Sequence, residues 1–116
     1  MGLVEPRFFL PICEDADIGN GEIHPYGRWQ KLETDLFVKY DGWTLSPGLY
    51  RGMYRDPDTG KPIGDLSKQY ILAVEEERIP DLRQYLKEHV AVLFRQKVIY
   101  LFNGREVELL TSIEMT

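Results

Sequence analysis

The stretch 70-YILAVEEERIPDLRQYLKEHVAVLFRQKVIYLF-102 and the segment 103-NGREVELL-110 that follows it decide the fold. The apolar run over 68–74 predicts a central strand, because strands covered on both faces read as continuous apolar segments. Apolar residues then recur every three or four positions on one face of a predicted helix, at Ile79, Leu82, Leu86, Val90 and Leu93. A strand over 98–102, a two-residue type I′ turn at Asn103-Gly104 and a last strand complete the pattern.

The residues before this stretch repeat its pattern less regularly. They predict a strand over 7–12, an acidic loop over 13–23, a helix over 25–40, an edge strand over about 48–55 and a loop over 56–65. That loop joins the edge strand to the central strand as a long hairpin. The last residues, 112–116, are expected to form a tail.

The resulting order of elements is β-α-β-β-α-β-β. Two β-α-β units in series predict an α+β fold of the ferredoxin-like type with an added C-terminal strand. We expect one antiparallel sheet with both helices on one face and the other face open. At 116 residues the chain, 1–116, has the length of a single domain.

Composition and charge disfavour several classes of function. A net charge of −5 lacks the basic footprint of a nucleic-acid-binding protein. The single cysteine, Cys13, cannot form an internal disulfide, so nothing indicates an oxidising compartment. No apolar segment approaches the roughly 20 residues that cross a bilayer, and no leader peptide is apparent. We therefore expect a cytoplasmic protein without a membrane partner.

No motif for a metal or a cofactor is recognisable. The acidic loop fails the EF-hand pattern, because Gly19 and Tyr26 stand at the fifth and twelfth positions counted from Asp15, where that pattern places ligands. Neither His24 nor His89 has a second histidine or cysteine at ligand spacing. The glycines of residues 42–64 match neither a Walker A loop nor a dinucleotide fingerprint. The sequence therefore predicts no metal and no cofactor.

The hairpin region carries the residues that we select as a candidate ligand-binding site. Alternation along the edge strand gives it one aromatic face and one basic face, and a hairpin could bring an arginine near an acidic residue of the partner strand. Arginine beside tyrosine suits an anionic or aromatic ligand. The alternative is that these residues form cross-strand ion pairs and aromatic packing. The candidate residues are Tyr50, Arg51, Tyr54, Arg55, Asp56, Asp65, Lys68, Gln96 and Tyr100; no catalytic residue is assigned.

Several short motifs resemble those of small bacterial domains of unknown function. The motifs are Trp29 with Leu32, Tyr40-Asp41-Gly42-Trp43-Thr44-Leu45, Gly52-x-Tyr54-Arg55-Asp56, Asp65-x-Ser67-Lys68 and Phe94-x-Gln96. The similarity spans about residues 25–102. It implies an α+β fold, and it implies no reaction, since that family has no assigned activity.

Two classes of function remain open from the sequence. The first is a non-enzymatic binding or assembly module that uses its open sheet face for homodimerisation or for a partner, because an uncovered aromatic face marks an interface. The second is a small-molecule enzyme or sensor of the dimeric α+β-barrel kind, in which Tyr100 or His89 could move a proton. Nucleic-acid binding on an open sheet is a third and weaker hypothesis.

Overall fold

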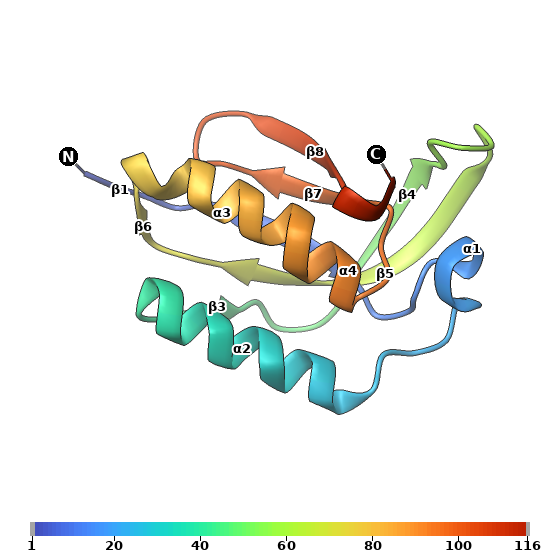
Figure 1. The fold of residues 1–116 in the computed structure, drawn as a ribbon, viewed down its shortest axis with the longest axis horizontal. Helices are drawn as coiled ribbons and strands as arrows, with labels where there is room; N and C mark the ends of the chain where they lie inside the picture. Colours follow the sequence, from blue (N-terminus) through green and yellow to red (C-terminus); the bar gives the residue numbers. More distant parts are fainter. Residues whose placement is uncertain (1, 116) are drawn as a thin grey trace.

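The structure is a computed structural model that describes residues 2–115. Figure 1 shows the arrangement of its elements. The strands are β1 (Leu3–Val4), β2 (Arg7–Pro11), β3 (Thr44–Leu45), β4 (Tyr50–Arg55), β5 (Pro62–Ile71), β6 (Val74–Glu75), β7 (Val98–Phe102) and β8 (Val107–Thr111). The helices are α1 (Ala16–Gly19), α2 (Tyr26–Tyr40), α3 (Ile79–Tyr85) and α4 (Ala91–Leu93), with 3-10 turns at Glu76–Arg78 and Ile113–Met115 and a π-helical segment at Leu86–Val90.

The main sheet has the strand order β3-β5-β2-β7-β8, and β4 pairs with the other end of the same edge of β5. These pairings are antiparallel, and β1 forms a small second sheet with β6. The edge strand is interrupted between β3 and β4, where Gly48 has φ of 76°. The chain therefore has an α+β fold, with β5 inside the sheet and β4 at its edge as the sequence predicts.

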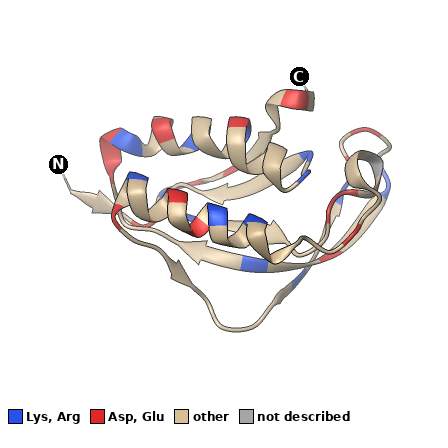
Figure 2. Cartoon of the chain, turned by 60° about the horizontal axis from the view of Figure 1, so that its bottom comes forward, with Lys and Arg blue, Asp and Glu red and all other residues tan. Residues whose placement is uncertain are grey.

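Both long helical segments cover the same face of the sheet (Figure 2). Their apolar stripes pack on alternate residues of the strands: Phe8 and Leu10 in β2, Tyr70 in β5, and Ile99 and Leu101 in β7 are all buried. Each buried aliphatic or aromatic side chain contributes about 1.5–3 kcal/mol to folding. In this core, the apolar side chains that recur every 3.6 residues over 79–93 pack against the strand side chains that point to the helices at every second residue.

Two predicted boundaries and one predicted loop are wrong. The loop predicted over 56–65 is shorter, because β5 begins at Pro62, and this strand ends at Ile71 instead of residue 74. Proline is tolerated there because Pro62 is the first residue of the strand. The predicted acidic loop contains the one-turn helix α1.

The turn and tail predicted near the C-terminus also differ from the structure. Phe102 pairs with Val107, so the connection has four residues instead of two. The side chain of Asn103 accepts hydrogen bonds from the backbone N–H groups of Arg105 and Glu106, at 2.9 and 3.0 Å, and this local bonding favours the longer loop. The predicted tail is ordered as far as it is described: Ser112 is buried, and its backbone N–H donates to the carbonyl of Lys97.

Within residues 2–115, no helix is both long enough and apolar enough to span a membrane.

His24 is buried beside α2, edge-on to the rings of Trp29 and Phe94. Its Nδ1 lies 3.0 Å from Nη1 of Arg28, and its Nε2 has no hydrogen-bond partner among the described residues. Burial first, and the positive charge of Arg28 second, lower the pKa of His24 from 6.5 to about 4. The imidazole is therefore held neutral in the folded protein.

This neutral histidine predicts a loss of stability in mild acid. The unfolded chain binds a proton at His24 below pH 6.5, whereas the folded chain binds it only near pH 4, so stability falls as the pH drops between these values. Urea unfolding at two pH values measures the effect: between pH 7 and pH 5 we expect the free energy of unfolding to fall by roughly 1–2 kcal/mol more in the wild type than in His24→Leu. Equal pH slopes for the two proteins would contradict this role of His24.

Candidate functional site

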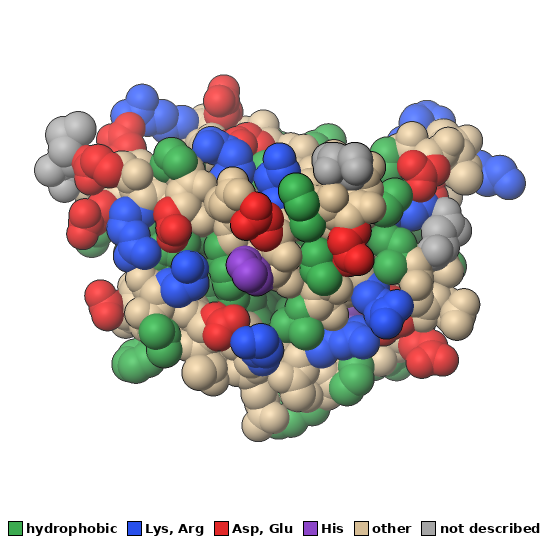
Figure 3. All heavy atoms as spheres, in the orientation of Figure 1, with side chains coloured by type: hydrophobic (Ala, Val, Ile, Leu, Met, Phe, Trp, Pro, Cys, Tyr) green, Lys and Arg blue, Asp and Glu red, His purple; other side chains and the backbone are tan. Residues whose placement is uncertain are grey.

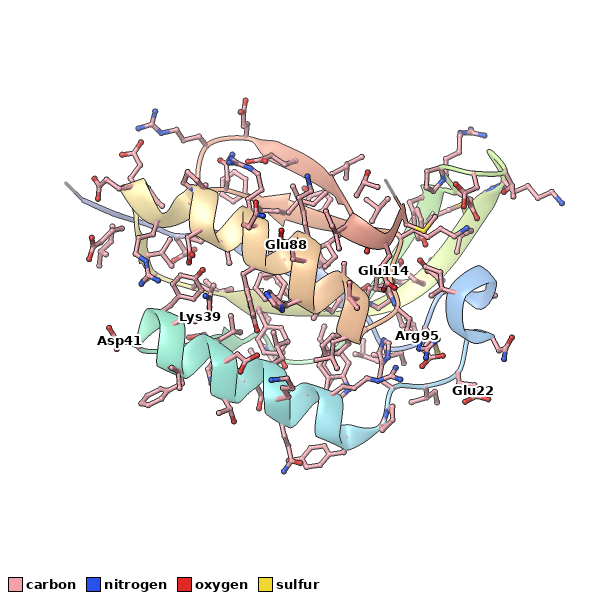
Figure 4. All side chains as sticks on the ribbon, in the orientation of Figure 1. Glu22, Lys39, Asp41, Glu88, Arg95 and Glu114 are labelled. Atoms are coloured by element: carbon pink, nitrogen blue, oxygen red, sulfur yellow. The ribbon has the colours of Figure 1, made fainter. Side chains whose placement is uncertain are left out.

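A hollow of about 1050 Å³ lies between the β4–β5 hairpin and the segment that leads from β2 into α1. Its size is at the upper end of the range for small-molecule pockets. Backbone and apolar side chains form much of its wall, and the polar side chains on it belong to Glu14, Asp15, Arg51, Tyr54, Asp56, Asp65 and Lys97. Figure 4 shows the side chain of Arg95, a residue that follows α4, extending toward α1 next to the hollow. There its guanidinium donates to the carbonyl of Ile18 at 3.2 Å.

Asp15 links the two sides of the hollow. Its Oδ1 accepts a hydrogen bond from the hydroxyl of Tyr54 at 3.0 Å, and its Oδ2 accepts one from the backbone N–H of Lys97 at 2.7 Å. Burial raises the pKa of Asp15 even though both bonds favour its ionised form. Burial and the charge of Asp15 together raise the pKa of Tyr54, so this hydroxyl keeps its proton.

The side chain of Lys97 anchors the end of the hairpin. Lys97 is 2% exposed, and its Nζ lies 3.0 and 3.2 Å from the carboxylate oxygens of Asp56 and 3.1 Å from Oδ2 of Asp58. Asp56 also accepts the backbone N–H of Asp58 at 2.7 Å, and this bond and the lysine lower the pKa of Asp56. Lys97 therefore holds the hairpin turn with its side chain and Asp15 with its backbone.

Asp65 is a carboxylate on the wall of the hollow that makes no ion pair with any described residue. Among the described residues it accepts one hydrogen bond, from the hydroxyl of Ser67 at 3.3 Å. Burial raises its pKa, and the negative charge of Asp15 adds to this rise. Asp65 faces Gly52 across the strands, and a Cβ atom at Gly52 would lie 3.3 Å from Asp65 Oδ1. The glycine leaves the carboxylate open toward the hollow, as glycine in a strand often does where a ligand approaches.

The structure brings together four of the nine residues selected from the sequence, since Arg51, Tyr54, Asp56 and Asp65 line the hollow. The expectation that the hairpin brings Arg51 or Arg55 near Asp65 is wrong, and so is the alternative of a cross-strand ion pair between them. Asp65 pairs in register with Gly52, so Arg51 points to the opposite face of the strand, and neither Arg51 nor Arg55 forms an ion pair with Asp65 among the described residues. The side chain of Arg55 instead donates to the carbonyl of Gly60 at 2.7 Å.

The other selected residues lie elsewhere. Tyr50 and Tyr100 are on the open face of the sheet, where both pack edge-on against Phe9. Lys68 lies on the helix-covered face with its Nζ 4.0 Å from the ring centre of Trp29. Gln96 is buried, and its Nε2 donates to the carbonyls of Cys13 and Phe94. These four residues are therefore not part of the hollow, and His89 lies in a different cleft.

Sequence reasoning misses Asp15 and Lys97, the two residues that connect the hollow to the rest of the fold. Asp15 falls in the acidic loop that the sequence predicts to be solvated, and Lys97 follows a buried glutamine in a short link. The available signal is the position of Lys97 directly before the strand 98–102, where a lysine that enters the sheet needs a carboxylate partner. No group of three or more His, Cys, Asp or Glu side chains within the described part of the chain is arranged to hold a metal ion.

Comparisons with known proteins give a likeness of fold. No protein-family model and no curated protein matches the sequence, which is consistent with the resemblance to domains without an assigned activity. A phage SAM lyase in complex with S-methyl-5′-thioadenosine has a similar structure, with a TM-score of 0.69 and 16% identity over 96% of this chain and 91% of that chain. The apo state of a phage SAM lyase gives a TM-score of 0.62 at 15% identity, over 97% of this chain and 91% of that one.

A divalent cation tolerance protein, Cut A1 from Thermus thermophilus, is also similar. Its TM-score is 0.52 at 13% identity, over 97% of this chain and 85% of that chain. At these levels of identity the likeness concerns the fold alone. It extends over 96–97% of this chain.

Proposed function

We propose that the chain is a small-molecule enzyme that binds an adenosyl sulfonium compound in the hollow and cleaves it as a lyase. The observation that carries this proposal is Asp65, a half-buried carboxylate with spare acceptor capacity, set beside the Asp15–Tyr54 pair on the wall of a hollow of about 1050 Å³. Support comes from the fold likeness to a SAM lyase that holds S-methyl-5′-thioadenosine.

The chemistry of such a reaction limits where in the hollow a carboxylate can lie. Cleavage of S-adenosylmethionine to S-methyl-5′-thioadenosine breaks the bond between sulfur and the carbon chain that carries the amino-acid group. The bonding electrons pass to sulfur, which loses its positive charge. Because a lyase uses no water, an oxygen of the substrate's own carboxylate attacks the carbon, so that a carbon–oxygen bond forms as the carbon–sulfur bond breaks and the fragment leaves as a lactone. A carboxylate beside the sulfur would stabilise the charged substrate more than the transition state and slow this step. We therefore assign Asp65 to the substrate ammonium group, which keeps its charge.

The apolar wall and the glycines suit the rest of such a ligand. Gly52 in β4 and Gly64 in β5 carry no side chain, so a planar ring can approach the backbone of the hairpin at these positions. Tyr54 keeps its hydroxyl protonated, and its ring offers a face to a cation. Arg51 lines another part of the wall, on the face of β4 opposite to Tyr54 and Asp65, so we do not assign it to the amino-acid group that Asp65 binds.

An activity assay tests the proposal. The purified chain is incubated with S-adenosylmethionine, and the nucleoside products are separated by chromatography. We expect S-methyl-5′-thioadenosine to appear in proportion to the protein, and we expect Tyr54→Phe to release it at a rate reduced by about tenfold or more, because Asp15 then loses its hydroxyl partner. Absence of both turnover and binding of S-adenosylmethionine by the wild type would refute the proposed function.

We also infer that the topology is ferredoxin-like with β8 added. The strand order β4-β5-β2-β7, with α2 following β2 and α3 following β5 and β6, supports this assignment. The similarity to Cut A1 over 97% of the chain is compatible with it. Such a sheet leaves one face free of helices.

A second candidate function rests on that open face. Its surface carries a row of exposed or half-exposed side chains, the aromatic row, formed by Tyr50, Phe9, Tyr100 and Leu109. Contiguous apolar side chains on a soluble protein mark an interface. Homodimerisation through this face would make the chain an assembly module. It is compatible with the enzymatic proposal, because the hollow lies at the hairpin and none of the residues of the aromatic row lines it.

Light scattering tests this second candidate. If copies of the chain associate through the aromatic row, the wild type has a mass that is a multiple of 13.6 kDa, and Leu109→Glu reduces the mass to that of one chain, because a buried carboxylate has no partner there. Phe37→Glu, at an exposed apolar position of α2, is the matched control and keeps the wild-type mass. A wild type that is monomeric at every concentration would exclude self-association.

A further inference from the structure

A second cleft, separate from the hollow, lies between α2 and the helical segment over 79–93. Its volume is about 400 Å³, and it shares no lining residue with the hollow. Figure 3 shows a histidine side chain at the surface of this region, with both basic and acidic side chains around it. Lys31, Asp35 and Lys39 of α2 form one wall, and Tyr85, His89 and Val90 belong to the other. Neither the sequence motifs nor the proposed reaction uses these residues.

The backbone of the second wall is unusual. His89 and Val90 belong to the π-helical segment Leu86–Val90, which interrupts the helix that runs from Ile79 to Leu93. A π-helical turn widens a helix and is frequently found at functional sites. Exposed His89 lies four residues after buried Tyr85, so the two are neighbours on the helix surface, and their ring centres are 5.8 Å apart. The wall that carries the histidine therefore includes this π-helical turn.

The charges of the cleft leave donors in excess. The carboxylate of Asp35 is already engaged, since it accepts a hydrogen bond from the Tyr85 hydroxyl at 3.1 Å and lies 3.4 Å from Nζ of Lys31. Lys39 has its Nζ 5.1 Å from the ring centre of Tyr85. The imidazole of His89 makes no hydrogen bond to any residue that the structure describes. Among the described residues that line the cleft, two ammonium groups and one imidazole thus face one carboxylate, and the Nζ of Lys39 also lies 3.9 Å from Oδ2 of Asp81, which is outside the lining.

The floor of the cleft is apolar. Val90 is buried, and Leu93 is half-buried and packs against the core. Figure 4 shows the labelled Lys39 on the side of α2 that faces α3. A ligand would therefore meet cationic donors at the mouth and aliphatic side chains below. A volume of about 400 Å³ limits such a ligand to a small molecule, near the lower end of known pockets.

We propose that this cleft binds a small organic carboxylate. The carboxylate accepts hydrogen bonds from Lys39 and His89, and its apolar part rests on Val90 and Leu93. Asp35 is engaged by Tyr85 and Lys31, and the carboxylate of the ligand replaces Asp81, 3.9 Å away, as the partner of Lys39. This site lies on the helical face, so its ligand can be present at the same time as one in the hollow.

Proton NMR of the two histidines tests the proposal, with benzoate as the probe. The full chain has only His24 and His89, and buried His24 serves as an internal reference. We expect benzoate to shift the ring C–H resonances of His89 saturably and to leave those of His24 unchanged. Benzylamine, which has a similar ring and the opposite charge, is expected to cause no shift. Saturable shifts of equal size with both probes, or none with benzoate, would overturn the proposal.

A matched pair of variants tests the residues. Lys39→Met is expected to weaken benzoate binding by about fivefold or more, because a charged donor is lost while the aliphatic part of the side chain remains. Lys87→Met, on the same helix as His89 but outside the cleft, is expected to bind as the wild type does. Equal affinities of Lys39→Met and the wild type would contradict the assignment. If benzoate still shifts the His89 resonances of Lys39→Met with unchanged affinity, benzoate does not bind in this cleft.

Discussion

Replacing Lys97 with alanine is expected to lower the Tm by on the order of 10 °C. The ammonium group is buried and lies 3.0 Å from Asp56 and 3.1 Å from Asp58, so its removal leaves the carboxylate of Asp56 inside the protein without its cation. Breaking a buried ion pair on one side costs more than the pair contributes as a whole, because the remaining charge is uncompensated. Thermal unfolding followed by circular dichroism measures the change.

Two further variants show whether the pair is the cause. Lys61→Ala removes an exposed lysine from the same hairpin, and its Tm is expected to remain within about 2 °C of the wild type. The double variant Lys97→Met with Asp56→Asn removes both charges, and it should regain part of the stability that Lys97→Ala loses. A Lys97→Ala protein as stable as the wild type would mean that the hairpin is held by its strand pairing alone.

Replacing Asp65 with asparagine is expected to weaken the binding of S-adenosylmethionine by about tenfold to a hundredfold, the effect of losing a hydrogen bond between two charged groups. The change preserves the size of the side chain and the bond from Ser67. S-methyl-5′-thioadenosine lacks the ammonium group, so its affinity should change by less than about threefold. Isothermal titration calorimetry with both ligands gives the two ratios.

Asp41→Asn is the matched control for this variant. Asp41 ends α2, far from the hollow, and its φ of 65° suits asparagine as well as aspartate. Both ligands are expected to bind this variant with wild-type affinity. Equal losses for the two ligands in Asp65→Asn would show that Asp65 shapes the hollow and does not contact the ammonium group.

Much of the fold could be predicted because local patterns and packing agree. The spacing of Trp29, Leu32 and Leu36 places α2, and the apolar run around Tyr70 places β5 inside the sheet. The error at the last turn arises because a local side-chain hydrogen bond outcompetes a common turn type. Asn103-Gly104 favours a two-residue turn, yet the Asn103 side chain captures two backbone N–H groups and lengthens the loop.

The candidate site could be predicted only on the hairpin itself. Tyr54, Asp56 and Asp65 are near one another in the sequence, so their proximity follows from strand pairing. The bond between Asp15 and the backbone of Lys97 joins residues that are 82 positions apart, and no periodicity encodes such a contact. The error at Lys68 has a different cause, because alternation along β5 already separates Lys68 from Asp65 and puts it on the helix-covered face, where it packs on Trp29.

A crystal structure of the chain grown with S-methyl-5′-thioadenosine tests the central claim most directly. The account predicts ligand density in the hollow between the β4–β5 hairpin and residues 13–16, with the adenosyl group against Gly52 and Gly64 and the sulfur side toward Tyr54. Density at any other place on the molecule, or an empty hollow in crystals saturated with the ligand, would contradict it.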